Sequence, residues 1–114
     1  MKSAFRSLKK NQEFRRVYRT GRSRANKVLV MLIMKNDDAD NRVGISVSKK
    51  VGNSVVRHRV TRIIREIMRL HWGEIRKGYD IVIIARESAR DSDYYCLESA
   101  LLHLLKLHHL VKDY

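Results

Sequence analysis

The chain has 114 residues, of which 44% are hydrophobic and 32% charged, and its 25 Lys and Arg against 12 Asp and Glu give a net charge of +13. This length suits one domain, and the hydrophobic fraction excludes a disordered polycation. The charge is segregated, because residues 1–27 hold ten basic residues and one acid while residues 42–76 hold nine basic residues and two acids. Such segregation indicates a polyanionic partner, with nucleic acid the first candidate and anionic lipid the second.

The cysteine content and the first residues of the chain indicate the cellular compartment in which the protein is expected. Cys96 is the only cysteine, so no internal disulfide can form, which suits a reducing compartment. The first ten residues are basic and lead into more charge, and no apolar run approaches the ~20 residues of a membrane span. We therefore expect a cytoplasmic protein without a membrane partner.

The first predicted element is a short helix between Asn11, which suits an N-cap, and Gly21, which suits the C′ position. Within it Phe14, Val17 and Tyr18 fall at the i, i+3, i+4 spacing of one helix face. One short amphipathic helix is therefore expected before any strand.

Two strands are predicted next, joined by a turn. The apolar run 28–34 predicts the first strand, the polar residues 36–41 predict a hairpin turn, and residues 42–48 predict the second strand. The second strand alternates, so that one face carries Val43, Ile45 and Val47 and the other carries Arg42, Gly44, Ser46 and Ser48. Its polar face is expected to be shallow.

A helix is predicted from about Ser54 to about His71. Its apolar residues step by three or four and form one stripe, which comprises Val56, Val60, Ile63, Ile67 and Leu70. Basic residues follow the same spacing on the other side, namely His58, Arg62, Arg65 and Arg69. One face of this helix is therefore expected to be core and the other cationic.

The remaining elements complete the domain. Residues 79–85 predict a buried strand, and Asp91 or Ser92 is expected to cap a last helix whose inward residues are Leu97, Leu101, Leu104 and Leu105. The element order is αββαβα. This order predicts a single α+β domain over residues 1–114 with a mixed central sheet packed by helices.

The cationic face of the helix 54–71 is informative about a ligand. Arginines three and four residues apart on a helix lie ~5–6 Å apart and repel one another unless each has an anionic partner. A phosphate backbone satisfies them, because each guanidinium can bind two phosphate oxygens and release condensed counterions. The alternative is a solvated helix face without a partner, and the clean separation of the apolar stripe favours the phosphate ligand.

The segment from Arg42 to Glu66, RVGISVSKKVGNSVVRHRVTRIIRE, resembles the signature of the bacterial ribonuclease P protein component. The similarity extends over nearly the whole chain through LKKNQEF, the Ala25-Asn26 pair and IVIIAR. His58 stands where this family usually has Asn, and Thr61 where a Lys is common. The resemblance implies a ribosomal protein S5 domain 2-like fold with a left-handed βαβ crossover.

The resemblance also implies a function and a site. It implies the protein subunit of ribonuclease P, a monomer that binds the catalytic RNA and the 5′ leader of precursor tRNA and assists removal of that leader, with magnesium bound mainly by the RNA. Residues matching the RNA-subunit site are Lys49, Lys50, Asn53, Arg57, His58, Arg59, Arg62, Arg65 and Arg69. Those matching the leader site are Phe14, Tyr18, Arg42, Ser46 and Ser48, and aromatic rings stack on bases without sequence preference. Core packing is the other interpretation of Phe14 and Tyr18.

Catalysis by the polypeptide itself is not expected. Clustered carboxylates for two metals, or a His pair acting as acid and base, are absent from the pattern. The acids Asp37, Asp38 and Asp40 suit a turn, and the histidines lack the spacing of a metal site. We expect no catalytic or metal-ligating side chain and no small-molecule substrate. The alternatives are a ribosomal or RNA-chaperone protein, a protein-only nuclease and, more weakly, a DNA-binding regulator.

Overall fold

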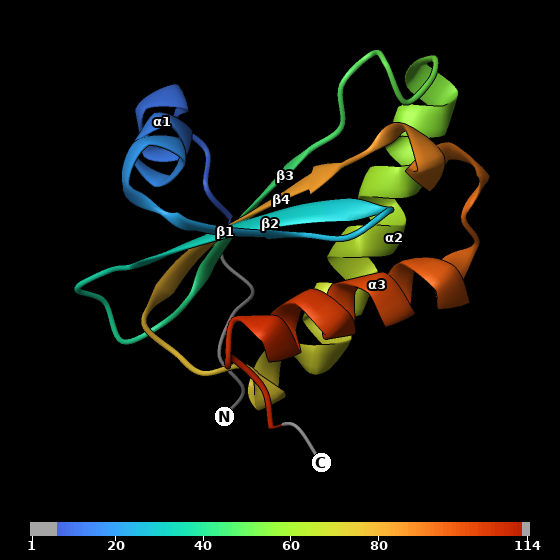
Figure 1. Ribbon diagram of the computed structural model, residues 1–114. Helices are drawn as coiled ribbons and strands as arrows, with labels where there is room; N and C mark the ends of the chain where they lie inside the picture. The colour runs from blue at the N-terminus through green and yellow to red at the C-terminus, as the bar shows by residue number, and fades with distance from the viewer. Residues whose placement is uncertain (1–6, 113–114) are drawn as a thin grey trace.

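The computed structural model describes residues 7–112, which form one layered α+β domain (Figure 1). The helices and strands, in chain order, are α1 (Asn11–Thr20), β1 (Arg22–Ala25), β2 (Leu29–Lys35), β3 (Arg42–Ser46), α2 (Ser54–His71), β4 (Tyr79–Ala85) and α3 (Tyr94–Leu107), with short 3₁₀ helices at Trp72–Glu74 and Glu87–Asp91. Helix α1 lies on one face of the sheet, and α2 and α3 cover the other. The predicted α+β class with a mixed sheet is confirmed.

The sheet has the strand order β1-β2-β4-β3, so the predicted hairpin between residues 28–34 and 42–48 is wrong. Strand β4 lies between them, antiparallel to β2 and parallel to β3. The reason is burial: β4 is apolar on both faces and belongs in the centre, whereas β3 carries Gly44 and Ser46. The segment 36–41 instead crosses the start of β4, where Asn41 Nδ2 donates to the Arg76 carbonyl at 2.9 Å and Asn41 Oδ1 accepts the Tyr79 N–H at 2.8 Å.

Strand β1 was not predicted. All four of its residues, RSRA, are exposed, and it pairs antiparallel with β2 at one edge of the sheet. A strand without a buried face has no hydrophobic alternation by which sequence analysis could detect it. The observed order of helices and strands is therefore αβββαβα.

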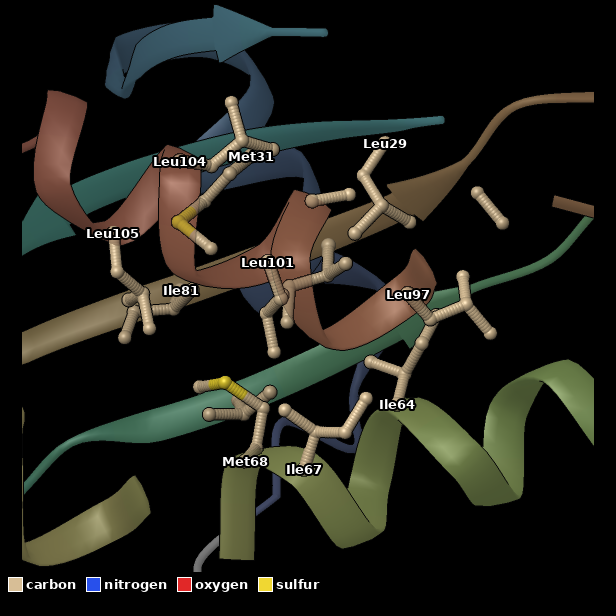
Figure 2. Packing of buried hydrophobic residues seen from close by; sticks show 14 of the residues in the cluster. Leu29, Met31, Ile64, Ile67, Met68, Ile81, Leu97, Leu101, Leu104 and Leu105 are labelled. Carbon is tan, nitrogen blue, oxygen red and sulfur yellow. The ribbon is translucent and has the colours of Figure 1, made fainter. Parts of the chain in front are cut away.

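The main core lies between the sheet and helices α2 and α3 (Figure 2). Every second residue of β2 and β4 points into it, and the predicted inward residues of α3 are all fully buried: Leu97, Leu101, Leu104 and Leu105. In Figure 2 Leu97 lies beside Ile64 of α2, and Leu104 lies beside Met31 of β2. Packing against α3 and the sheet fixes the orientation of α2 and hence of its exposed face.

Helix α2 is rotated relative to the stripe predicted for it. Leu70 is 53% exposed, whereas Ile64 and Met68 are fully buried. Because α3 and the sheet cover α2 from two sides, the buried strip is wider than one row of residues and centres on Val60, Ile64 and Ile67. The exposed positions of the predicted cationic face are unaffected by this correction.

Three local predictions also need correction. The N-cap of α3 is Asp93, whose side chain accepts the Cys96 N–H, because residues 87–91 form a 3₁₀ helix first. The N-cap of α1 is Lys10, and Gly21 ends that helix with extended backbone at φ −77°, not in the left-handed conformation.

Helix α1 covers the other face of the sheet through a smaller core. Its buried members are Leu8, Val17, Leu32 and Val82, and the half-buried Phe14 packs against them. The Phe14 ring lies above Gly44 of β3, where a Cβ atom would fall 2.5 Å from Phe14 Cε1. Helix α1 covers only part of this face and leaves a cleft beside β3.

Candidate nucleic-acid interface

A cleft of about 400 Å³ lies between α1 and the edge strand β3. It is lined by Asn11, Phe14, Arg15, Tyr18, Ile45 and Ser46. The Phe14 and Tyr18 rings are 6.4 Å apart between centroids, and Tyr18 is 45% exposed. The structure thus brings together three predicted leader-binding residues, Phe14, Tyr18 and Ser46. Phe14 also packs on the smaller core, as the alternative interpretation expected, and its binding of the leader stays a prediction.

Arg42, another predicted leader-binding residue, is held by two carboxylates. Its Nε and Nη2 donate to Asp80 at 2.9 and 2.8 Å, and its Nη1 donates to Glu13 at 2.6 Å. Asp80 is buried, and its hydrogen bond raises the pKa of Arg42. The backbone N–H groups of Lys10 and Lys9, together with Arg42, lower the pKa of Glu13. Arg42 therefore anchors α1 to the sheet.

The exposed face of α2 carries the predicted cationic residues. His58, Arg62 and Arg65 are exposed and form no ion pair with any carboxylate of residues 7–112. Arg69 differs, because it pairs with Glu66 at 2.6 Å and lowers the pKa of that carboxyl. Arg62 and Arg65 are thus free to bind an external anion.

Arg59 and Asn53 have contacts of their own within the chain. Arg59 Nη2 donates to the Arg90 carbonyl at 2.6 Å and Nη1 to the Ser92 carbonyl at 3.3 Å. Asn53 is the N-cap of α2 and accepts the Val56 N–H at 3.0 Å. These two predicted RNA-binding residues therefore stabilise the start of α2 and its contact with the segment before α3.

A second pocket, of about 380 Å³, lies between β3 and α2. Its lining comprises Ile45, Val47, Ser54, Arg57, His58, Thr61 and Arg65. Arg57 Nε is buried and has no hydrogen-bond partner among the described residues. Ile45 borders both this pocket and the cleft beside α1, so the aromatic and the cationic sites adjoin along β3.

A third pocket, of about 550 Å³, lies where β3 and β4 end. Ser48 and Lys50 were predicted to bind RNA, and they line it together with Lys27, Val51, Ala85, Arg86, Glu87 and Ser88. Lys27, Arg86 and Ser88 were not predicted, because they come from segments that only the sheet brings together. The available signal was the pair Ala25-Asn26, which precedes Lys27, and the segment IVIIAR, which ends at Arg86. Lys49 is exposed in the same loop.

His71 and His108 have partners within the chain. His71 Nε2 lies 3.0 Å from Glu98 and Nδ1 lies 3.2 Å from Glu74. Burial opposes its charge, but the hydrogen bonds with Glu98 and Glu74 outweigh this and raise the pKa of His71. His108 Nε2 donates to the Met31 carbonyl at 2.9 Å, and burial lowers its pKa.

The described residues contain neither a candidate metal site nor a candidate membrane-spanning helix. In residues 7–112 no group of three His, Cys, Asp or Glu side chains is placed to hold a metal ion. Over the same part of the chain, no helix combines the length and apolarity needed to cross a membrane.

The fold and this surface define a small basic α+β protein with an aromatic cleft beside an arginine-bearing helix, an arrangement suited to a nucleic-acid strand. The family model described as Ribonuclease P matches residues 2–109. The chain belongs to the ribonuclease P protein family, which implies a role as the protein subunit of a tRNA-processing endoribonuclease.

Individual relatives agree with this assignment. The ribonuclease P protein component of Lachnoclostridium phytofermentans is 54% identical over 107 residues, covering 94% of this chain and 92% of the relative. That of Alkaliphilus metalliredigens is 56% identical over 99 residues, covering 87% and 89%. The RNase P protein structure from Staphylococcus aureus aligns with a TM-score of 0.88 at 39% identity, covering 96% of this chain and 100% of that one. The Thermotoga maritima structure gives 0.82 at 34%, covering 89% and 96%.

Proposed function

We propose that this protein binds the catalytic RNA subunit of ribonuclease P and the 5′ leader of precursor tRNA, and that it assists cleavage carried out by the RNA. One observation carries the proposal: the unpaired arginines of α2 and the Phe14/Tyr18 cleft adjoin along the edge strand β3. A protein with this surface can hold a structured RNA and a single strand side by side.

The α2 face suits the RNA subunit. Arg62 and Arg65 are exposed and pair with no carboxylate of residues 7–112, and His58 lines the same pocket as Arg65. Arginine binds phosphate oxygens through a planar fork, so a folded RNA backbone is a fitting ligand. The buried, unpaired Nε of Arg57 would gain a partner if RNA entered the pocket between β3 and α2. The Lys49 and Lys50 loop would extend the same contact.

The cleft beside α1 suits the leader. Phe14 and Tyr18 offer ring faces, and stacking on a ring contributes ~1–3 kcal/mol per base without sequence preference. On β3 the small residue Ser46 lines the cleft and leaves room for an RNA backbone, whereas Gly44 is covered by the Phe14 ring. Arg15 at the rim supplies positive charge for the phosphates. Ser48 and the third pocket continue the same surface.

The polypeptide's contribution is positioning and charge screening. Magnesium would be bound mainly by the RNA subunit, and screening of phosphates by α2 would allow cleavage at a lower magnesium concentration. His58, in place of the usual Asn, can still donate a hydrogen bond to RNA. The protein would act in the cytoplasm as a monomer within the ribonucleoprotein.

The test is cleavage of a 5′-extended precursor tRNA at low magnesium by a bacterial ribonuclease P RNA alone, by the protein alone and by both. Activity only in the mixture is expected. Cleavage by the protein alone would establish a protein-only nuclease instead. Tight RNA binding without stimulation would favour a ribosomal or RNA-chaperone role.

A further inference from the structure

The N-terminal basic segment identified in the sequence is only partly explained by the proposed sites. Of its arginines, Arg15 lines the aromatic cleft, whereas Arg22 and Arg24 lie on β1, at the opposite edge of the sheet from β3. Both arginines are exposed, and neither forms an ion pair with any carboxylate of residues 7–112. A separate ligand would account for their charge.

The strand register shows which way these arginines point. Arg22 pairs with Ile33 and Arg24 with Met31, and both partners belong to the main core beneath α3. Directly paired residues of antiparallel strands share a face, so Arg22 and Arg24 lie on the α3 side of the sheet. Their positive charge also adds to burial in lowering the pKa of His108 on α3. The arginines therefore flank the C-terminal half of α3.

Residues of α3 and of the segment that follows it add further hydrogen-bond donors beside Arg22 and Arg24. Asn26 Nδ2 donates to the Ala100 carbonyl at 2.9 Å and lies 3.1 Å from His103 Nδ1. These two contacts hold the end of β1 against α3. Since Nδ1 accepts from the amide, His103 keeps Nε2–H as an outward donor. His109 is exposed and close enough to act on His108.

The two chain segments that carry this charge contain no acidic residue. Residues 14–35, which include β1 and β2, and residues 99–112, which include the end of α3, contain no Asp or Glu in the sequence. We define the β1/α3 surface as Arg22, Arg24, His103 and His109. Charged residues on an edge strand also prevent the sheets of two molecules from pairing. Edge protection alone, however, does not require that the neighbouring segment 99–112 also lack acidic residues.

We propose that the β1/α3 surface binds the phosphate backbone of a second RNA segment, so that one protein molecule bridges two RNA segments. This inference rests on the proposed binding of RNA by α2. The two surfaces lie at opposite edges of the sheet, because α3 contacts β1 and β2 whereas α2 contacts β3. Three interstrand spacings, or about 14 Å, separate the edges before the width of α3 is added. Two RNA segments can therefore be bound at once.

The test is the stoichiometry with which the full-length protein binds a short RNA duplex, measured by analytical ultracentrifugation at low salt. The variants are Arg22→Gln with Arg24→Gln, and Arg62→Gln with Arg65→Gln; the control is Lys35→Gln with Lys77→Gln, near the acidic loop 36–41. Wild type and control are expected to bind two duplexes, and each arginine variant one. Thermal unfolding checks that every variant is folded.

The outcomes separate this inference from the proposed function. Wild-type protein that binds one duplex, or an Arg22/Arg24 variant that still binds two, overturns the second surface and leaves α2 binding intact. Self-association of the Arg22/Arg24 variant without loss of a duplex would assign these arginines to edge protection alone. Failure of wild type to bind any duplex would contradict RNA binding by α2 as well.

Discussion

The Phe14 ring occupies the space above Gly44 that any larger residue would need for its Cβ atom. This contact sets the distance between the Phe14 ring and β3 at the aromatic cleft. Phe14 and Ser46 both line that cleft, and Gly44 lies next to Ile45, another lining residue, on the same strand. The glycine is required for close approach of a ring to the sheet and not for a special backbone angle.

Replacing Gly44 with Ala should displace Phe14 and change the cleft. The added methyl group would meet Phe14 Cε1 and Cζ at 2.5 Å, and overpacking of this kind costs about 1–3 kcal/mol. We expect lower stability in urea and weaker binding of a single-stranded leader RNA. Gly73→Ala is the matched control, because nothing lies within 4 Å of its Cβ position. Equal leader affinity of the two variants would contradict this account of the cleft.

Replacing Asp80 with Asn should destabilise the fold. Asp80 is buried and accepts two hydrogen bonds from Arg42 and one from Asn36 Nδ2. The substitution removes the charge of one of the two carboxylates that hold Arg42, and weakening these charged hydrogen bonds costs about 2–3 kcal/mol in the free energy of unfolding. Urea unfolding of Asp80→Asn and of the exposed control Asp37→Asn measures the difference. Similar midpoints would show that Glu13 alone suffices to hold Arg42.

Replacing Arg62 and Arg65 together with Ala should weaken binding to ribonuclease P RNA and lower the slope of log affinity against log salt by about one to two units. Both side chains are exposed and form no ion pair within the described range 7–112, so stability should hardly change. Titrations at several salt concentrations measure the slope. An unchanged slope would mean that this face is only solvated.

Arg59→Ala is the informative comparison for the pair Arg62 and Arg65. Its guanidinium donates to the carbonyls of Arg90 and Ser92, so its loss should lower stability more than it lowers the salt slope. The reverse result would place Arg59 among the RNA contacts.

The stability contributed by His71 should depend on pH. Its pKa is raised above the ordinary value of 6.5 by Glu98 and Glu74 despite burial, so its contribution is fully present below about pH 6.5 and is lost as pH rises through the raised pKa. Wild type should exceed His71→Gln by about 1 kcal/mol at low pH, since Glu74 is largely exposed. Urea unfolding of both proteins below about pH 6.5 and above the raised pKa of His71 measures the change.

A companion variant tests the cause of this pH dependence. Glu98→Gln removes the 3.0 Å contact with His71 Nε2 and should reduce the same pH-dependent difference. His108, whose pKa is lowered, is present in every variant and cancels in these comparisons. A difference between wild type and His71→Gln that is constant with pH would exclude the charged pairing.

Local pattern was sufficient for several features of this protein. Apolar spacing predicted α1, α2, α3 and the inward leucines of α3, because helical periodicity records which face is buried. Charge spacing predicted the exposed arginines of α2. The motif from Arg42 to Glu66 pointed to the ribonuclease P protein family, which the family match confirms.

Tertiary structure alone decided the rest. No local signal places β4 between β2 and β3, reveals the fully exposed β1, or turns α2 so that Leu70 faces solvent. The same holds for Arg42 and Arg59, whose partners lie about 30 to 40 residues away in the sequence. Strand order and long-range ion pairs depend on which segments bury most surface together, and spacing within one segment cannot encode that competition.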